Sequence, residues 1–276
     1  MDATSNYYDA VYDSYKLGWS ADHLHTGMWD EATHSHQQSL INTIDRISDA
    51  LDIQTTDRVL DAGCGVGGAA RYLAERTGCS VHGITYSHVL LAEAQAALER
   101  YPHPDRVQCH FMDFADTSFA DASFTKVFAL ESVSHGRDKH AFAKEAFRLL
   151  EPGGRLVVSD GFLLRSELSA ADDDIYQRFL EGWALPYLAN PEAFVDGLKQ
   201  IGFVDARFED RTADVMRSVR YMHRNARMSR HIYRLLHAAR MTSKARYLSA
   251  ESAYLYRLCI DRGIMGYGFA LARKPE

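Results

Sequence analysis

The feature that most constrains this chain is a glycine-rich loop between a short apolar run and a helical pattern. The apolar run predicts a strand at Arg58–Asp61, and Gly63, Gly65, Gly67 and Gly68 follow before helical spacing begins. Glycines let a backbone turn sharply and approach a ligand closely, and the start of a helix presents free N–H groups. We therefore expect a ligand site at this loop.

Short β-rich runs alternate with helical patterns from about residue 55 to 165, which is typical of a parallel sheet wrapped by helices. The predicted strands are Arg58–Asp61, Ser80–Ile84, Val107–Met112, Phe124–Leu130 and Arg155–Asp160. The predicted helices are Gln37–Leu51, Gly68–Arg76, Val89–Arg100 and His140–Leu150. A tight turn at Glu151–Gly154, a further helix at Pro191–Ile201 and strands at Phe203–Phe208 and Gly266–Leu271 complete the pattern.

A single α/β domain accounts for this organisation, since 276 residues suffice for one core with an added cap. We expect an N-terminal lid over residues 1–50 and a ligand-binding core over 51–165. A mostly helical insertion over residues 166–250 would bind the substrate, and residues 251–276 would form the final strand.

The ligand of the glycine loop has three interpretations: a dinucleotide, an amino-acid cofactor, or none if the turn is only structural. Gly63, Gly65 and Gly68 satisfy the dinucleotide pattern, but such a site needs a carboxylate about 20 residues on to bind ribose. The second strand ends in Gly83–Ser87, which holds no carboxylate. Asp61 would repel a pyrophosphate and attract an ammonium group. S-adenosylmethionine, which carries an ammonium group, therefore fits better than a nicotinamide cofactor.

Several segments resemble class I S-adenosylmethionine-dependent methyltransferases, and in particular the γ-tocopherol, sterol and cyclopropane-fatty-acid methyltransferase families. They are Tyr7–Asp9, His25–Asp30, Asp61–Gly68, Val81–Ser87, and Glu131–His135 with Asp138–Lys139. The resemblance runs from about residue 6 to 165 and thins through the helical insertion. It implies a Rossmann-like sheet with helices on both faces, an N-terminal lid, and a helical insertion before the last strand.

The resemblance also implies the residues that hold the methyl donor. Asp61, Gly63, Gly65 and Gly67 would bind its amino-acid portion.

One departure from the family concerns the ribose. Leu90 stands three residues after Ser87, where the subgroup usually has glutamine, so Thr85 or Ser87 would contact the ribose instead. Asp113 and Phe114 match the pair that receives the adenine; alternatively, they are a loop acid beside a core phenylalanine.

Three side chains are candidates for the chemistry of methyl transfer. Glu131 and His135 follow a strand at the cofactor edge of the sheet, and a histidine titrates near neutral pH, as a base should. Alternatively, His135 caps the helix that starts near Asp138. Tyr8 would close over the sulfonium as part of the lid, or it lies on the surface as an amphipathic aromatic.

A basic segment is the other marked feature, since residues 215–250 hold nine Lys or Arg, three His and no Asp or Glu. Its arginines recur at helical spacing and share one face. This face is a solvated surface, a site for an anionic acceptor such as a prenyl diphosphate, phospholipid or carboxylate, or a contact for a partner subunit with an acidic surface. The candidate acceptor-binding residues are Trp29, Trp183, Arg217, Arg220 and Arg224.

Composition and missing motifs exclude several function classes. The net charge of −6 and the absence of the [DNS]-P-P-[YFW] and Pro-Cys motifs argue against nucleic-acid methylation. The four cysteines form no CxxC pair, and nothing fixes a metal geometry for His23, His25, His34 and His36. No apolar run is long enough to span a membrane, and no signal peptide is evident. We expect a cytoplasmic protein that acts alone or as a homo-oligomer.

The sequence thus predicts transfer of a methyl group from S-adenosylmethionine to a hydrophobic small molecule of lipid, terpenoid or aromatic natural-product type. An enzyme that methylates a prenyl diphosphate or another anionic lipid at carbon is the nearest alternative. An NAD-dependent oxidoreductase and a non-catalytic S-adenosylmethionine-binding module are alternatives from other classes.

Overall fold

The computed structural model describes residues 3–276 and contains a seven-stranded sheet in the order β3-β2-β1-β4-β5-β7-β6. Neighbouring strands are parallel except around β7, which runs antiparallel to β5 and β6. The strands are β1 (Arg58–Ala62), β2 (Ser80–Thr85), β3 (Val107–Phe111), β4 (Phe124–Leu130), β5 (Leu150–Leu163), β6 (Val204–Asp210) and β7 (Met265–Arg273).

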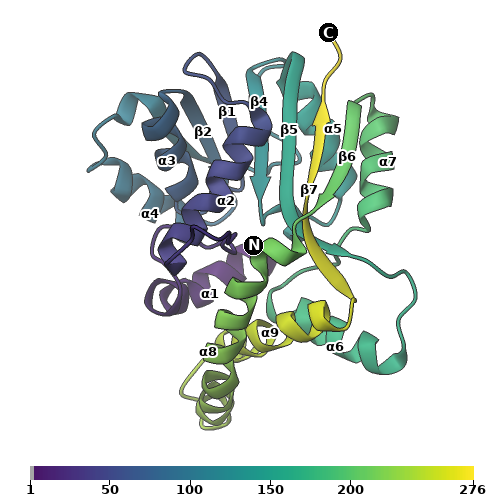
Figure 1. Cartoon of the computed structure of the whole chain (residues 1–276). Helices are drawn as coiled ribbons and strands as arrows, with labels where there is room; N and C mark the ends of the chain where they lie inside the picture. The colour runs from purple at the N-terminus through teal and green to yellow at the C-terminus, as the bar shows by residue number, and fades with distance from the viewer. Residues whose placement is uncertain (1–2) are drawn as a thin grey trace.

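Helices cover both faces of this sheet, as predicted (Figure 1). Strand residues alternate between the two core layers: Val59 and Phe128 pack on one face, Leu60 and Val127 on the other. The helices that flank the sheet are α2 (His36–Leu51), α3 (Gly68–Thr77), α4 (His88–Leu98), α5 (Lys139–Leu149) and α7 (Pro191–Ile201).

A second group of helices gathers beyond the carboxyl ends of the parallel strands, in the lower half of Figure 1. It comprises α1 (Ala3–Gly18), α6 (Ala170–Gly182), α8 (Thr212–Ala238) and α9 (Lys244–Asp261). Helix α9 packs against α1, α6 and α8. Among the described residues, no helix has the length and apolar content to cross a membrane.

Helix α1 is an element that the sequence analysis did not predict. Tyr7, Val11 and Tyr12 are buried on it, at the spacing of four and five residues that places side chains on one helical face. Polar residues stand between these buried side chains and masked the helical spacing in the sequence. Met1 and Asp2 of the predicted lid lie outside the described residues.

Two predicted boundaries were wrong. Glu151–Gly154, predicted as a tight turn, lies within β5, where the pairing with β4 shifts register and Gly153 has a φ of +76°. Residues 251–261, assigned to the final strand, belong to α9 because buried Leu255 and Cys259 continue its helical period. The final strand therefore begins at Met265.

Candidate active site

The candidate site lies where the strand order reverses, between β1 and β4. Strands β2 and β3 lie to one side of β1, whereas β4 and β5 lie to the other. The loops that leave the carboxyl ends of two such strands diverge and open a crevice, which is where α/β sheets bind ligands. Gly63 follows β1 and Glu131 follows β4, so both predicted site segments meet there.

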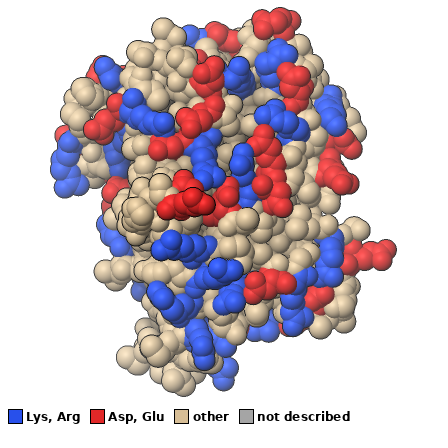
Figure 2. All heavy atoms as spheres, viewed as in Figure 1, with Lys and Arg blue, Asp and Glu red and all other residues tan. Residues whose placement is uncertain are grey.

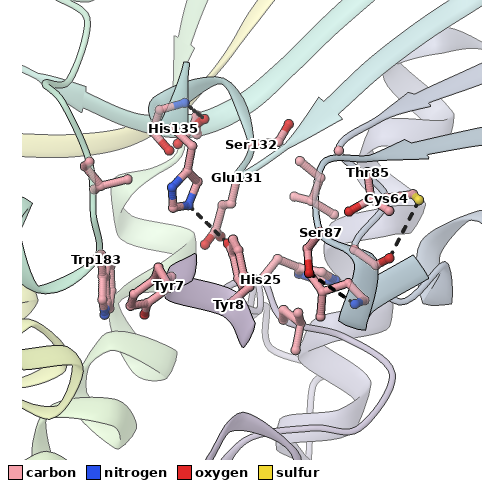
Figure 3. Close-up of a pocket in the computed structure, with 18 of the residues that line it drawn as sticks. Tyr7, Tyr8, His25, Cys64, Thr85, Ser87, Glu131, Ser132, His135 and Trp183 are labelled. Atoms are coloured by element: carbon pink, nitrogen blue, oxygen red, sulfur yellow. Dashed lines mark hydrogen bonds between the residues drawn. The ribbon is translucent and has the colours of Figure 1, made fainter. Parts of the chain in front are cut away.

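A pocket fills this crevice, and we call it the aromatic pocket. Figure 3 shows Cys64, Thr85 and Ser87 on one side, Trp183 and Tyr7 on the other, with Tyr8 between them. Its glycine-loop side includes Asp61, Gly63, Gly65, Thr85, Ser87 and Phe114. Its opposite side includes Tyr8, Glu131, His135, Trp183, Tyr256 and Tyr267. The structure thus brings ten of the sixteen predicted site residues together.

The glycine loop takes a conformation that side chains resist. Gly63 has a φ of +112°, and a Cβ there would lie 2.2 Å from the Cβ of Ser132. Gly65 lines the pocket with a φ of +53°. Left-handed backbone costs other residues about 1–2 kcal/mol, so glycine is the natural choice at both positions. The predicted contact residue Gly67 starts α3 with a φ of +71° but does not line the pocket.

Asp61 supplies a direct test of whether the methyl donor fits. Its side chain is 1% exposed, and its Oδ2 atom has no hydrogen-bond partner among the described residues. Burial raises the pKa of this carboxyl group well above its usual value, and Cys109 adds to the effect. A buried acid without a partner is costly, and a bound ammonium group removes that cost. The residues present therefore fit the amino-acid portion of S-adenosylmethionine.

The predicted ribose and adenine contacts divide into two groups. Thr85 and Phe114 line the pocket, whereas Asp113 does not; its Oδ1 accepts from the backbone N–H of Ala115 at 2.8 Å. Ser87 lines the pocket but also has structural contacts. Its Oγ caps α4 by accepting from the N–H of Leu90 in the first turn of that helix, and it donates to Asp9 of α1.

Glu131 is held in a strained conformation at the end of β4. Its φ is +49°, which is uncommon for a residue other than glycine and often marks a functional site. Its Oε1 atom accepts from the N–H of Thr26 at 2.6 Å and from the hydroxyl of Tyr267 at 2.9 Å. Burial raises the pKa of Glu131 to about 7. This carboxyl group therefore changes its charge near neutral pH.

His135 and Tyr8 form a second polar group in the pocket. The Tyr8 hydroxyl lies 3.1 Å from Nε2 of His135, so Tyr8 faces the pocket rather than the surface (Figure 3). Burial raises the pKa of Tyr8 well above 10, and its phenol stays protonated. Asp138, not His135, caps α5 by accepting from the N–H groups of His140 and Ala141. The helix-cap interpretation of His135 was therefore wrong.

Comparison with known proteins shows the family to which the chain belongs. A family model described as "Methyltransferase domain" matches residues 60–158. The chain is 32% identical over 218 residues to 2-methyl-6-phytyl-1,4-hydroquinone methyltransferase of Synechocystis sp., covering 75% of this chain and 67% of that protein. It is 34% identical over 159 residues to 27-O-demethylrifamycin SV methyltransferase of Amycolatopsis mediterranei, covering 58% of each.

The fold is also similar to that of solved structures. The structure of the cyclopropane synthase MmaA2 from Mycobacterium tuberculosis superposes with a TM-score of 0.85 at 16% identity, covering 98% of this chain and 97% of that one. The chain belongs to the S-adenosylmethionine-dependent methyltransferases. The match to the rifamycin enzyme extends over little more than half of that relative's length.

Sequence reasoning missed several groups that line the pocket of this methyltransferase. Asp160 lies in β5, and its carboxylate accepts from the N–H of Ser134 at 2.8 Å. This hydrogen bond fixes the turn that carries His135. Tyr267 of β7 bridges Glu131 and Ser159. Their signal is positional: Asp160 lies on β5, beside β4, and Tyr267 lies on β7, one strand further on, and both are level with the carboxyl end of β4.

The methyltransferase has a second hollow of about 580 Å³, which we call the basic hollow. It is lined by Trp29, His36, Arg217, Arg220, Arg224 and Arg227, among others. Four of the five predicted acceptor-binding residues therefore lie outside the aromatic pocket, and only Trp183 lines it. The two hollows also divide the four histidines noted above: His23 and His25 line the first, His34 and His36 the second.

Proposed function

We propose that this methyltransferase transfers a methyl group to a hydrophobic small molecule that carries no negative charge where it binds. The observation that carries the proposal is the lining of the aromatic pocket: no Lys or Arg of the described residues lines it, whereas Asp22, Asp61, Glu131 and Asp160 do. An anionic group would lose its hydration and gain no counter-charge there.

The acceptor side of the pocket suits a flat or lipid-like molecule with one polar group. Trp183 packs against Phe179 and Tyr256 with ring centroids 5.0 and 5.3 Å apart, and Met222 and Leu188 also line the space. The indole Nε1 of Trp183 is buried and has no hydrogen-bond partner among the described residues. An oxygen atom of the acceptor would satisfy this donor.

The chain's own groups can position the acceptor and remove its proton. S-adenosylmethionine, when bound, supplies a methyl group on sulfur for an in-line displacement. Glu131 then accepts the proton of the acceptor, because a base with a pKa near 7 is effective at neutral pH. Thr26 and Tyr267 hold its carboxylate in place. The Tyr8–His135 pair covers the reacting groups and excludes water.

A prenyl diphosphate acceptor is the weaker candidate. Its two phosphates would need cationic partners, and the arginines predicted to supply them line the basic hollow instead. Relatives named for a phytyl hydroquinone and for demethylrifamycin SV support a hydrophobic acceptor.

Incubation with methyl-labelled S-adenosylmethionine and a fractionated metabolite extract tests the proposal. We expect the label in an uncharged, solvent-extractable product, and no label with a Glu131→Gln variant. Label in a water-soluble phosphate ester would contradict the proposal. Binding of S-adenosylhomocysteine without any labelled product would favour a non-catalytic binding module, and protection from heat by NADH would favour an oxidoreductase.

A further inference from the structure

We propose that the outer face of α8 binds an anionic phospholipid surface. On this face the arginines of the basic hollow contact lipid phosphates, and an apolar tip enters among the acyl chains. We define the apolar tip as Met228, Ile232 and Leu235, with Met241 in the turn that follows. This inference concerns where the protein binds, and it does not depend on which molecule is methylated.

Of the five arginines that line the basic hollow, only Arg257 has an acidic partner among the described residues, Asp261 at 3.0 Å. Within residues 3–276, none of Arg217, Arg220, Arg224 and Arg227 forms an ion pair. Arg217 instead lies 3.9 Å from the ring centroid of Trp29, which orients the guanidinium without neutralising it. Neighbouring cations repel one another, so a row of this kind favours an external anion.

The apolar tip is exposed to an unusual degree. Met228, Ile232, Leu235 and Met241 are 74%, 53%, 70% and 74% exposed. Large apolar side chains that cluster at the surface mark contacts with other molecules or with membranes. In Figure 1 the lower end of α8 projects away from the sheet, with α9 packed along one side of the helix.

The arginines and the tip share one side of the helix. At 3.6 residues per turn, Arg217, Arg224, Met228 and Leu235 fall within about 40° of one another around the axis, and Arg220, Arg227 and Ile232 widen this face to about 140°. The basic row covers about 15 Å of α8 and the tip a further 10 Å or so. Figure 2 shows Lys and Arg gathered over the lower part of the molecule, with uncharged atoms beside them at its end. Exposed His231 and Arg234 lie among the tip residues, so the tip would enter the boundary between headgroups and acyl chains, where long basic side chains can reach back to the phosphates.

Other partners fit this face less well. A second copy of the chain that met it by a two-fold axis would bring arginine rows toward each other. A nucleic acid would use the arginines but leave the apolar tip in water, since it is bound through phosphates and base edges. The chain's net charge of −6 also makes a general attraction to polyanions weak, so the attraction has to be local.

Vesicle flotation of the full chain tests this inference, with phosphatidylcholine vesicles compared with vesicles that also contain phosphatidylglycerol. We expect the protein to float only with the anionic vesicles and to be released by salt. Replacing Arg224→Gln and Arg227→Gln together should weaken partitioning about 25-fold, at about 5-fold per arginine. Leu235→Glu should abolish it, because a charge would have to enter the acyl layer.

Matched changes elsewhere serve as controls. Arg100→Gln removes an exposed arginine from the turn that follows α4, and Leu17→Glu changes a leucine of α1 that is 90% exposed. Both variants should float as the wild type does. Equal flotation with neutral vesicles, or unchanged flotation of Leu235→Glu, would overturn the inference. The inference would also be overturned if the protein formed a dimer in the absence of vesicles and Leu235→Glu dissociated that dimer. Stabilisation against heat by inorganic diphosphate, in a protein that does not bind vesicles, would overturn it as well.

Discussion

The aromatic pocket and the basic hollow share a wall but have opposite chemistry. Met222 of α8 lines the pocket, whereas its neighbours Tyr221 and His223 line the hollow. Buried acids and aromatic rings line the pocket, and the hollow is lined by five arginines, four of which have no acidic partner among the described residues. A single amphipathic helix can therefore serve two ligands of different charge, and the basic face alone does not reveal what the enzyme methylates.

Glu131→Gln should have the largest effect on the pocket's function. A positioned base contributes about 100- to 10,000-fold to a rate, so kcat should fall by at least about 100-fold. The amide keeps an oxygen that can accept from Thr26 and Tyr267, so the fold should persist. Wild-type kcat/KM should rise as the pH passes about 7, and the variant should lack this rise. A variant with full activity would remove Glu131 from the mechanism.

The same substitution gives a stability test with a defined sign. Because the folded pKa of Glu131, about 7, exceeds its unfolded value, its stabilising contribution is complete below pH 4.5 or so and is lost as pH rises through 7. The loss amounts to about 3 kcal/mol. Denaturation of the free protein at mildly acidic and at mildly alkaline pH measures this change. The free energy of unfolding should fall less between the two pH values for Glu131→Gln than for the wild type. Identical pH dependence would mean that the carboxyl group is already ionised at low pH.

Asp61→Asn should weaken S-adenosylhomocysteine binding by about 10- to 100-fold, the worth of one charge-assisted hydrogen bond. The stability of the free protein should not fall, because the substitution removes a buried carboxyl group whose Oδ2 has no hydrogen-bond partner among the described residues. Calorimetric titration and thermal unfolding would measure the two effects. Asp113→Asn, which changes an acid outside the pocket, is the matched control. A joint loss of affinity and stability in Asp61→Asn would assign Asp61 a structural role.

Trp183 lines the aromatic pocket and Trp29 lines the basic hollow, so the same substitution at each residue compares the two cavities. Trp183→Phe keeps the aromatic contacts but removes the indole N–H, so the KM for the acceptor should rise about 2- to 12-fold. Trp29→Phe should leave KM unchanged and lower stability by about 1 kcal/mol, because its Nε1 donates to Ser218 at 2.7 Å. Kinetics and denaturation of both variants check this. The reverse pattern would place the acceptor in the basic hollow.

The smallest effect concerns the edge of the pocket. Ser87→Ala should lower stability by about 1 kcal/mol because Ser87 caps α4, with little change in S-adenosylhomocysteine affinity. Thr85→Ala should do the opposite if Thr85 contacts the ribose, with an affinity loss of about 0.5–1.5 kcal/mol. Thermal unfolding and calorimetric titration separate the two. Loss of affinity in Ser87→Ala alone would restore the ribose contact to that residue.

Most strands and helices of the core could be predicted from local sequence patterns. Strand β4 was predicted over its full length, and β1, β2, α3 and α7 to within one residue at each end, because apolar period and glycine or capping residues coincide there. Helix α1 was missed because its buried tyrosines stand among polar residues. The separation of the arginines from Trp183 could not be predicted, since it depends on which side of α8 packs against the sheet.

We propose that the acceptor lies in the aromatic pocket and not in the basic hollow. The most direct test measures kcat/KM for the labelled acceptor, without vesicles, in a protein that carries Arg217→Gln, Arg220→Gln and Arg224→Gln together. We predict a value within about 2-fold of the wild type at both low and high salt, as for solvated charges. A KM that rises about 10- to 100-fold, and that salt reproduces in the wild type, would contradict the claim.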